Sequence, residues 1–309
     1  MTHGVDNAIA IMGATATGKS ELAIRLAEKY DGEVISMDSR QAYRGLDIGT
    51  GKISAEDQAR VPHHLIDVLD PHEPNTAGKH MERALGAWAE IRGRGRVAIF
   101  AGGTGLYFRA LFRGLIDVQI SDDDLVAQRN ELSTAPTWML YEELERVDPE
   151  RAAELSPRDR VRIQRSIEIY RCTGSSFTDH VARQNHQRRF AGLKLVLSMP
   201  REKLRDRIAE RTRELYARGW CREVRELLAG GVAPDAPAMN SLGYDLIAQT
   251  IRRGEDPLQT IDAVITVTQQ YAKRQETFFR SVRDAVWIDV SRPGWDREID
   301  RRVRIELGL

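Results

Sequence analysis

An eight-residue segment near the amino terminus, Gly13 to Ser20, reads G-A-T-A-T-G-K-S and constrains the fold more than any other feature. It follows the apolar run Ala8–Met12 and precedes the helical pattern Leu22, Ala23, Leu26 and Ala27, which is the strand-to-helix setting of a phosphate-binding loop. In such a loop the glycines allow a tight turn, backbone N–H groups and the helix amino end face an anion, and lysine adds positive charge. The sequence therefore predicts that a phosphate group is held by Gly13, Ala14, Thr15, Ala16, Thr17, Gly18, Lys19 and Ser20, with the Ser20 hydroxyl offered to Mg²⁺.

Apolar runs alternate with helical patterns in the first third of the chain, which predicts an α/β fold with a parallel sheet and helices on both faces, as in P-loop NTPase-like cores. The expected strands are Ala8–Met12, Val34–Met37, His64–Val68, Val97–Ala101, Leu193–Met199 and Val286–Val290. The expected helices of the core include Glu21–Tyr30, Ala77–Arg92 and Leu106–Arg113.

Residues 121–190 are polar, charged and helical in pattern, with no strand candidate, so we expect an all-helical insertion domain there. It divides the α/β core into residues 1–120 and 191–309. Such an insertion can be a lid or a clamp for a second substrate, or an excursion without a role.

The formal net charge is zero, with 46 basic and 46 acidic residues, so the sum gives no footprint for nucleic acid. A local cluster does stand out, because Arg158, Arg160, Arg162 and Arg165 accompany a single acid, Asp159. A longer arginine-rich stretch, 201–225, interleaves with acids and is typical of a solvated helix face.

Cys172 and Cys221 are the only cysteines, and they lie far apart, so we expect neither a disulfide framework nor a zinc site. No apolar run approaches the roughly 20 residues of a membrane span, and the polar start of the chain lacks a signal-peptide core. We therefore expect a cytoplasmic protein that does not interact with membranes.

Asp38 directly follows the apolar run Val34–Met37, at the sheet edge where α/β proteins bind ligands. It could be a metal ligand, a general base or a cap for the following segment. The run Val97–Ala101 leads into Gly102-Gly103-Thr104-Gly105 without an acid, which argues against a motor or hydrolase that holds Mg²⁺ with a second carboxylate. His63 and His64 are adjacent on a strand and would point to opposite faces, so we interpret them as structural residues.

Taken together, six segments resemble the tRNA dimethylallyltransferases, also called tRNA isopentenyltransferases, in the order in which that family has them. They are Gly13 to Ser20, D-S-R-Q-A-Y-R-G-L-D-I-G-T-G-K (Asp38 to Lys52), H-H-L-I-D-V-L-D-P (His63 to Pro71), G-G-T-G-L-Y-F-R-A-L (Gly102 to Leu111), D-x-x-R-x-x-R-x-x-E (Asp159 to Glu168) and A-K-R-Q-E-T-F-F-R (Ala272 to Arg280). The resemblance covers nearly the whole chain.

The resemblance implies transfer of a dimethylallyl group from dimethylallyl diphosphate to N6 of the adenosine adjacent to the anticodon. The phosphate loop, with Mg²⁺ at Ser20, would then hold the diphosphate leaving group, and Asp38 would accept the proton of the amine. Thr104 would orient the substrate or bind the diphosphate, and Arg211 would reach the diphosphate. The alternative for Arg211 is a surface ion pair with Glu210 or Glu214.

The resemblance also implies tRNA contacts, in which the anticodon stem-loop presents an unstacked adenosine. The candidate contacts are Asp38, Ser39, Arg40, Gln41, Thr104, Val161, Arg162, Ile163, Gln164, Arg165, Lys273 and Arg274. Phe278 and Phe279 could offer stacking surface or belong to the core. The chain departs from the family pattern at Ala14, Phe278 and Val126, and Arg129 could replace the arginine expected near Val126.

Two other functions share the phosphate loop. One is a small-molecule kinase that binds ATP, and the other is an RNA-binding protein that uses a bound nucleotide as a switch. The missing second acid argues against the switch, and the two arginine-bearing segments argue against the kinase. We expect a monomeric transferase whose partners are tRNA and dimethylallyl diphosphate.

Overall fold

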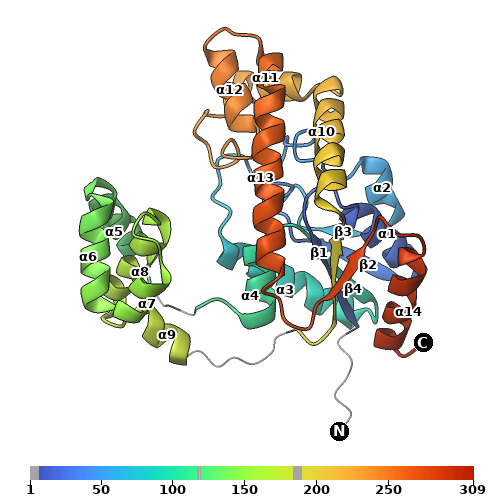
Figure 1. Ribbon diagram of the computed structural model, residues 1–309, viewed down its shortest axis with the longest axis horizontal. Helices are drawn as coiled ribbons and strands as arrows, with labels where there is room; N and C mark the ends of the chain where they lie inside the picture. The colour runs from blue at the N-terminus through green and yellow to red at the C-terminus, as the bar shows by residue number, and fades with distance from the viewer. Residues whose placement is uncertain (1–6, 117, 119, 184–189) are drawn as a thin grey trace. The chain divides into compact units, whose positions relative to one another are not determined.

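The computed structural model describes residues 7–116, 118, 120–183 and 190–309 (Figure 1). Within these residues a parallel sheet has the strand order β3-β2-β4-β1-β5-β6. Its strands are β1 (Ala8–Gly13), β2 (Gly32–Ser36), β3 (His63–His64), β4 (Val97–Gly102), β5 (Leu193–Ser198) and β6 (Val286–Asp289). Because β1 pairs with β4 and β4 with β2, the loops that follow these strands meet at the carboxyl edge of the sheet.

The sheet belongs to a compact unit formed by Met1–Phe112 and Arg189–Leu309. The described helices of this unit are α1 (Lys19–Lys29), α2 (Ala55–Arg60), α3 (Ala77–Gly93), α4 (Gly105–Arg113), α10 (Arg201–Ala217), α11 (Trp220–Ala229), α12 (Tyr244–Arg252), α13 (Ile261–Phe279) and α14 (Trp295–Leu307), with the 3-10 helix η1 at Pro257–Thr260. None of the helices in the described part of the chain combines the length and apolar character needed to cross a membrane.

Helices cover both faces of the sheet, as the sequence predicts. On one face Ile9 and Ile11 of β1 belong to an apolar cluster with residues of α1 and α14, including Leu22 and Ile299. On the other face the ring of Phe100 in β4 packs edge-on against Trp88 of α3, with ring centroids 5.4 Å apart. All six residues of β1 are buried, which is typical of a parallel strand covered on both sides.

A second compact unit, Arg113–Arg188, corresponds to the expected insertion but begins before residue 121. Its described helices are α5 (Asp122–Thr134), α6 (Thr137–Val147), α7 (Pro149–Glu154), α8 (Arg160–Thr173) and α9 (Phe177–Arg183). They share a core of their own that includes Leu132, Leu144, Ile163 and Ile167. The expected end of the insertion near 190 adjoins residues 184–189, which lie outside the described residues, as does the polar start of the chain at 1–6.

One expected strand, His64–Val68, is wrong in extent. Only His63 and His64 pair with β2, because Leu65 and Asp67 take left-handed backbone conformations with φ of 66° and 54°. The Lys52 ammonium holds this turn, since it donates to the Asp67 carboxylate at 2.5 Å and to the carbonyl oxygen of Tyr43 at 2.8 Å. The other expected strands and helices are confirmed, with ends that differ by one or two residues.

Candidate active site

The phosphate loop closes on itself and leaves the amino end of α1 open. The Thr17 hydroxyl and the Lys19 ammonium both donate to the carbonyl oxygen of Ala14, at 2.8 and 2.6 Å. Gly13 must be glycine, because it has φ 148° and an added Cβ would lie 2.5 Å from the carbonyl oxygen of Leu197. Gly18, at φ 88°, precedes α1 without a side-chain cap, so the first N–H groups of the helix remain available to an anion.

The loops after β2 and β4 are bonded to each other and bring Asp38 beside Thr104. The Thr104 hydroxyl oxygen accepts the Ser39 N–H at 3.2 Å, and the Thr104 N–H donates to the carbonyl oxygen of Met37 at 3.3 Å. One oxygen of Asp38, Oδ1, accepts the N–H of Arg40 at 2.8 Å and that of Gln41 at 3.4 Å. Asp38 therefore caps its own loop with Oδ1, while Oδ2 accepts no hydrogen bond from the described residues and is available for a substrate.

A cavity of about 450 Å³ unites these groups. Thr15 and Ala16 of the phosphate loop line it together with Asp38 and Arg211. Its apolar side chains, from α10, α11, α12 and the segment before α12, are Ile208, Leu215, Trp220, Leu242 and Tyr244. The cavity therefore offers a charged region for a phosphate group and an apolar wall for a hydrocarbon.

Arg211 lies in the cavity wall, where its guanidinium is largely buried, and among the described residues no ion pair joins it to Glu210 or Glu214. Ile208, Arg211, Thr212 and Leu215 recur at helical spacing, so one face of α10 lines the cavity. The alternative of a surface ion pair for Arg211 is therefore wrong, because the pattern of acids around it does not reveal which face of the helix is covered.

Positive charge exceeds negative charge around the phosphate loop. Burial and the nearby Arg211 lower the pKa of Lys19 to about 7, although the Asp38 carboxylate acts in the opposite direction. Burial likewise lowers the pKa of Arg211, again opposed by Asp38. Two half-buried cations with one carboxylate would stabilise a bound anion, and an anion would in turn favour their charged forms.

The loop Asp47–Lys52 forms another wall of the site and depends on Glu223 of α11. The Glu223 carboxylate accepts backbone N–H groups of Asp47 at 2.9 Å, Ile48 at 2.6 Å and Gly49 at 3.2 Å. It also accepts the hydroxyl of Tyr244 at 2.6 Å. Sequence reasoning missed Glu223, since it reads as one more charge on an amphipathic helix.

Two glycines of this loop allow close approach to cavity residues. A Cβ on Gly49 would lie 2.0 Å from the indole Nε1 of Trp220, and one on Gly51 would lie 2.1 Å from a guanidinium nitrogen of Arg211. Gly51 also has φ 60°, which disfavours other residues. The loop therefore packs directly against the arginine that faces the phosphate loop.

Gln275 and Tyr271 of α13 are further site residues that sequence reasoning missed. The Gln275 side chain accepts the Thr15 N–H at 2.9 Å and donates to the carbonyl oxygen of Gly103 at 2.8 Å. Tyr271 also lines the cavity, where burial raises the pKa of its hydroxyl to about 12. Gln275 follows Lys273 and Arg274 in the segment A-K-R-Q, and the two basic residues indicate RNA contacts rather than a role at the phosphate loop.

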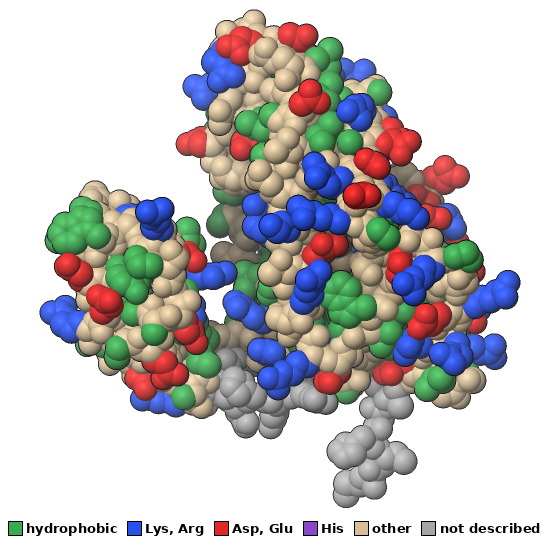
Figure 2. All heavy atoms as spheres, in the orientation of Figure 1, with side chains coloured by type: hydrophobic (Ala, Val, Ile, Leu, Met, Phe, Trp, Pro, Cys, Tyr) green, Lys and Arg blue, Asp and Glu red, His purple; other side chains and the backbone are tan. Residues whose placement is uncertain are grey.

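The candidate tRNA contacts of the α/β unit differ in their availability. Lys273 and Arg274 are exposed, and Figure 2 shows Lys and Arg side chains gathered over the region of α10 and α13. Ser39 and Arg40 line the cavity, and Arg40 also donates to the carbonyl oxygen of Pro237 at 3.1 Å. Gln41 is buried, and its amide nitrogen lies 3.4 Å from the carbonyl oxygen of Gly51, so its side chain supports the Asp47–Lys52 loop.

In the helical unit the expected contact stretch spans both faces of α8. The side chain of Ile163 is fully buried in the core, so the prediction that it faces RNA is wrong. Val161 is 80% exposed, and Arg162 is exposed with a weak ion pair to Asp159 at 3.4 Å. The error has a simple cause, because consecutive helical residues cannot all face one partner.

The buried Glu168 of α8 orders several polar side chains of the same unit. It accepts hydrogen bonds from Arg165 at 3.1 Å, from Gln164 at 3.3 Å and from Arg129 at 3.4 Å. Arg129, on α5, therefore lies close to Arg165, whereas Val126 is exposed on the same helix.

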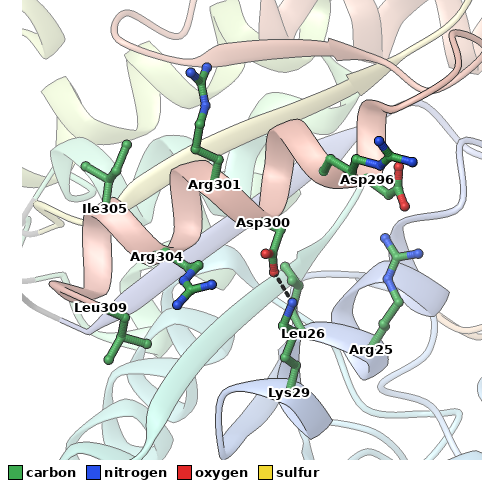
Figure 3. A pocket seen from close by; sticks show the side chains of 10 residues that line it. Arg25, Leu26, Lys29, Asp296, Asp300, Arg301, Arg304, Ile305 and Leu309 are labelled. Atoms are coloured by element: carbon green, nitrogen blue, oxygen red, sulfur yellow. Dashed lines mark hydrogen bonds and ion pairs between the residues drawn. The ribbon is translucent and has the colours of Figure 1, made fainter.

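Another groove, of about 550 Å³, lies between α1 and α14 (Figure 3). Two acids, Asp296 and Asp300, line it, and Asp300 pairs with Lys29. The basic lining residues are Arg25, Lys29, Arg297, Arg301 and Arg304. Lys29 is the last residue of α1, at the end opposite the phosphate loop, so this groove is separate from the site.

The residues present fit a magnesium ion held largely by its substrate. Ser20 is exposed in the first turn of α1, where its hydroxyl can be one ligand. Within the described residues no group of three or more histidine, cysteine or acidic side chains forms a protein-only metal site. Mg²⁺ commonly combines a few protein oxygens with phosphate oxygens and water, so diphosphate would complete the ligand set.

His63 and His64 have structural partners, in keeping with their interpretation from the sequence. The Nδ1 of His63 lies 2.8 Å from the carbonyl oxygen of Val61, and the Nε2 of His64 lies 2.7 Å from the buried Glu33 carboxylate.

A phosphate loop at the edge of a parallel sheet, sharing a partly apolar cavity with a carboxylate, is typical of a P-loop enzyme. Family models for IPP transferase and isopentenyl transferase match residues 41–282 and 6–67. The chain is 43% identical to tRNA dimethylallyltransferase 1 of Citrifermentans bemidjiense over 91% of each chain, and 39% identical to the tRNA dimethylallyltransferase of Methylococcus capsulatus over 97% of each.

The solved structures that are similar to this chain are also transferases that act on tRNA. A tRNA isopentenylpyrophosphate transferase from Bacillus halodurans has a TM-score of 0.71 at 32% identity, covering 97% of this chain and 96% of that chain. A eukaryotic dimethylallyltransferase acting on tRNA has a TM-score of 0.80 at 27% identity, covering 96% of this chain and 77% of that one. The chain belongs to the tRNA dimethylallyltransferase family.

Proposed function

We propose that the protein transfers a dimethylallyl group from dimethylallyl diphosphate to N6 of the adenosine adjacent 3′ to the anticodon, in tRNAs that read codons beginning with U. Diphosphate is the second product. The observation that carries this proposal is the single cavity shared by the phosphate loop, Asp38 and Arg211. It combines a cradle for a departing anion with a carboxylate that can receive a proton, as alkylation of an amine requires.

The reaction forms a bond between N6 and the allylic C1 carbon and breaks the bond between that carbon and the diphosphate oxygen. Asp38 accepts a hydrogen bond from the amine and takes its proton as the new bond forms. Lys19, Arg211 and the N–H groups of the loop stabilise the charge that develops on the leaving oxygen, and Mg²⁺ at Ser20 would supply further positive charge.

Orientation supplies much of the rate enhancement. Holding two reactants in line can contribute about 7–11 kcal/mol relative to their free encounter in solution. The apolar wall formed by Leu215, Trp220 and Tyr244 suits a five-carbon allyl group, and Thr104 lies beside Asp38, where it can orient the base. Extrusion of the adenosine from an anticodon loop costs only a few kcal/mol.

A transfer assay tests the proposal. The protein is incubated with dimethylallyl diphosphate, Mg²⁺ and unmodified tRNA, and the nucleosides of the digested RNA are analysed by mass spectrometry. We expect N6-dimethylallyladenosine in tRNAs that read U-initial codons, with one diphosphate released for each transfer. Absence of this nucleoside, together with phosphorylation of a metabolite in a parallel incubation with ATP, would support a kinase instead.

The tRNA contacts are tested separately through their salt dependence. Arg162→Ala removes an exposed cation of α8 that we propose contacts a phosphate, so tRNA affinity should fall and the salt slope should decrease by about one charge. Val161→Ala, on the adjacent exposed position, is the matched control and should leave the slope unchanged. An unaltered slope in Arg162→Ala would rule out this phosphate contact.

We further propose that the protein acts in the cytoplasm as a monomer, since its substrate is a tRNA and one chain contains every residue assigned to the transfer. Light scattering of the protein with and without tRNA measures the oligomeric state. A mass of one chain per tRNA is expected, and a stable dimer would contradict the proposal.

A further inference from the structure

Gln275 connects the two loops that the reaction needs. Its side chain is 5% exposed and lies on α13, far along the chain from both loops. It accepts the Thr15 N–H at 2.9 Å and donates to the carbonyl oxygen of Gly103 at 2.8 Å. Thr15 belongs to the loop after β1 and Gly103 to the loop after β4, so one amide group bridges neighbouring strands of the sheet.

The two partners fix the orientation of the amide. A backbone N–H requires an acceptor and a carbonyl oxygen requires a donor, and the side-chain amide of glutamine offers both from one planar group. Glycine at position 103 makes room for it, because a Cβ there would lie 2.2 Å from the Gln275 amide nitrogen. A side chain with only one of the two functions would leave a buried backbone group unpaired.

The bridge affects both halves of the site. Thr15 follows Ala14, whose carbonyl oxygen receives the Lys19 ammonium at 2.6 Å, so Gln275 restrains the corner of the loop to which this lysine is bonded. Gly103 precedes Thr104, whose hydroxyl oxygen accepts the Ser39 N–H at 3.2 Å next to Asp38. A shift of the amide would change the separation between the anion cradle and the carboxylate.

We propose that Gln275 is a positioning residue that sets the distance between the departing diphosphate and the carboxylate that receives the proton. This inference rests on the proposed function. Gln275 does not itself touch the reacting atoms. It acts through the Thr15 N–H on one side and through the Gly103 carbonyl, and so Thr104, on the other.

Gln275→Glu tests the proposal through pH. The carboxylate keeps the acceptor for Thr15 but loses the donor to Gly103, and protonation of the new acid restores that donor. We expect kcat about 10- to 100-fold below wild type near pH 8, with the deficit shrinking about tenfold near pH 6. The affinity for tRNA should stay within about twofold of wild type, since no tRNA contact is changed.

Gln269→Glu is the matched control. Gln269 lies on the same helix and donates to the carbonyl oxygen of Arg205 at 3.2 Å near the surface, outside the cavity. Its kcat should equal that of wild type at both pH values. Gln275→Met has a side chain of similar length that forms neither hydrogen bond, so its kcat should be reduced at every pH. It replaces the glutamate variant as the test if that variant does not fold.

The outcomes separate the two proposals. If wild type forms no prenylated adenosine, the proposed function fails, whatever the variants do. If wild type is active and Gln275→Met is equally fast, or if Gln275→Glu has a deficit that does not change with pH, the positioning role is overturned. A deficit that shrinks on acidification, with unchanged tRNA affinity, supports it.

Discussion

Glu223→Gln probes how much the Asp47–Lys52 loop depends on one buried carboxylate. The wild-type carboxylate accepts three backbone N–H groups and the Tyr244 hydroxyl. In its least costly orientation the glutamine places its nitrogen toward Gly49 and Tyr244, where the tyrosine hydroxyl can turn to accept. The Gly49 N–H then loses its acceptor, and the bonds to Asp47 and Ile48 become neutral.

An unpaired buried donor costs about 1–3 kcal/mol, and replacing a charged acceptor by a neutral one costs about 1 kcal/mol for each of the two remaining backbone bonds. The free energy of unfolding should therefore decrease by about 3–5 kcal/mol. Because Gly51 of this loop packs on Arg211, the KM for dimethylallyl diphosphate should also rise.

Urea denaturation followed by circular dichroism measures the free energy, and initial rates measure KM. Glu226→Gln is the matched control, since its ion pair with Arg222 spans 3.7 Å on the exposed face of the same helix, and it should cost less than about 0.5 kcal/mol. A loss below about 1 kcal/mol in Glu223→Gln, with unchanged KM, would refute this view of the loop.

Three further predictions concern charge, backbone and core. Burial lowers the pKa of Lys19 to about 7, so in the free enzyme this side chain loses its charge as pH rises through that value. Because anion binding needs the charged form, the affinity of wild type for pyrophosphate should fall above that pH. Relative to Lys19→Arg, isothermal titration should show a decrease of up to about tenfold per pH unit. A constant ratio would show that burial does not lower this pKa. Gly51→Ala should raise the KM for dimethylallyl diphosphate by about tenfold, because Gly51 has φ 60° and the new Cβ would displace Arg211. Steady-state kinetics equal to those of wild type would contradict this close packing. Ile163→Ala should lower the free energy of unfolding of the helical unit by about 2–5 kcal/mol, measured by urea denaturation, whereas Val161→Ala should be nearly neutral. Similar losses at both positions would contradict the assignment of the buried face.

The parts of the fold that the sequence predicts are those with local signals. The phosphate loop has its own spacing, the buried strands are short apolar runs, and Asp38 follows one of them directly. The sheet order then brings β2 beside β4 and β4 beside β1, so Asp38, Thr104 and the loop meet as the alternation of strands and helices implies.

Local sequence signals do not identify residues that reach the site from distant segments of the chain. Gln275 and Glu223 reach the loops through contacts that span more than 170 positions of the chain, and no local pattern separates them from ordinary polar residues of an amphipathic helix. The strand expected at His64–Val68 fails for a related reason. Its alternating pattern is compatible with a strand, yet Lys52 holds Asp67 in a turn instead.

The central claim is that Asp38 receives the proton of an amine that tRNA delivers to the allyl donor held by the phosphate loop. Single-turnover transfer by Asp38→Asn, measured with tRNA and dimethylallyl diphosphate already bound, tests it most directly. We predict that the affinity for both substrates stays within about threefold of wild type, while the rate of transfer falls by about 100-fold or more. A transfer rate near that of wild type, or a loss of tRNA binding that equals the loss of rate, would contradict the claim.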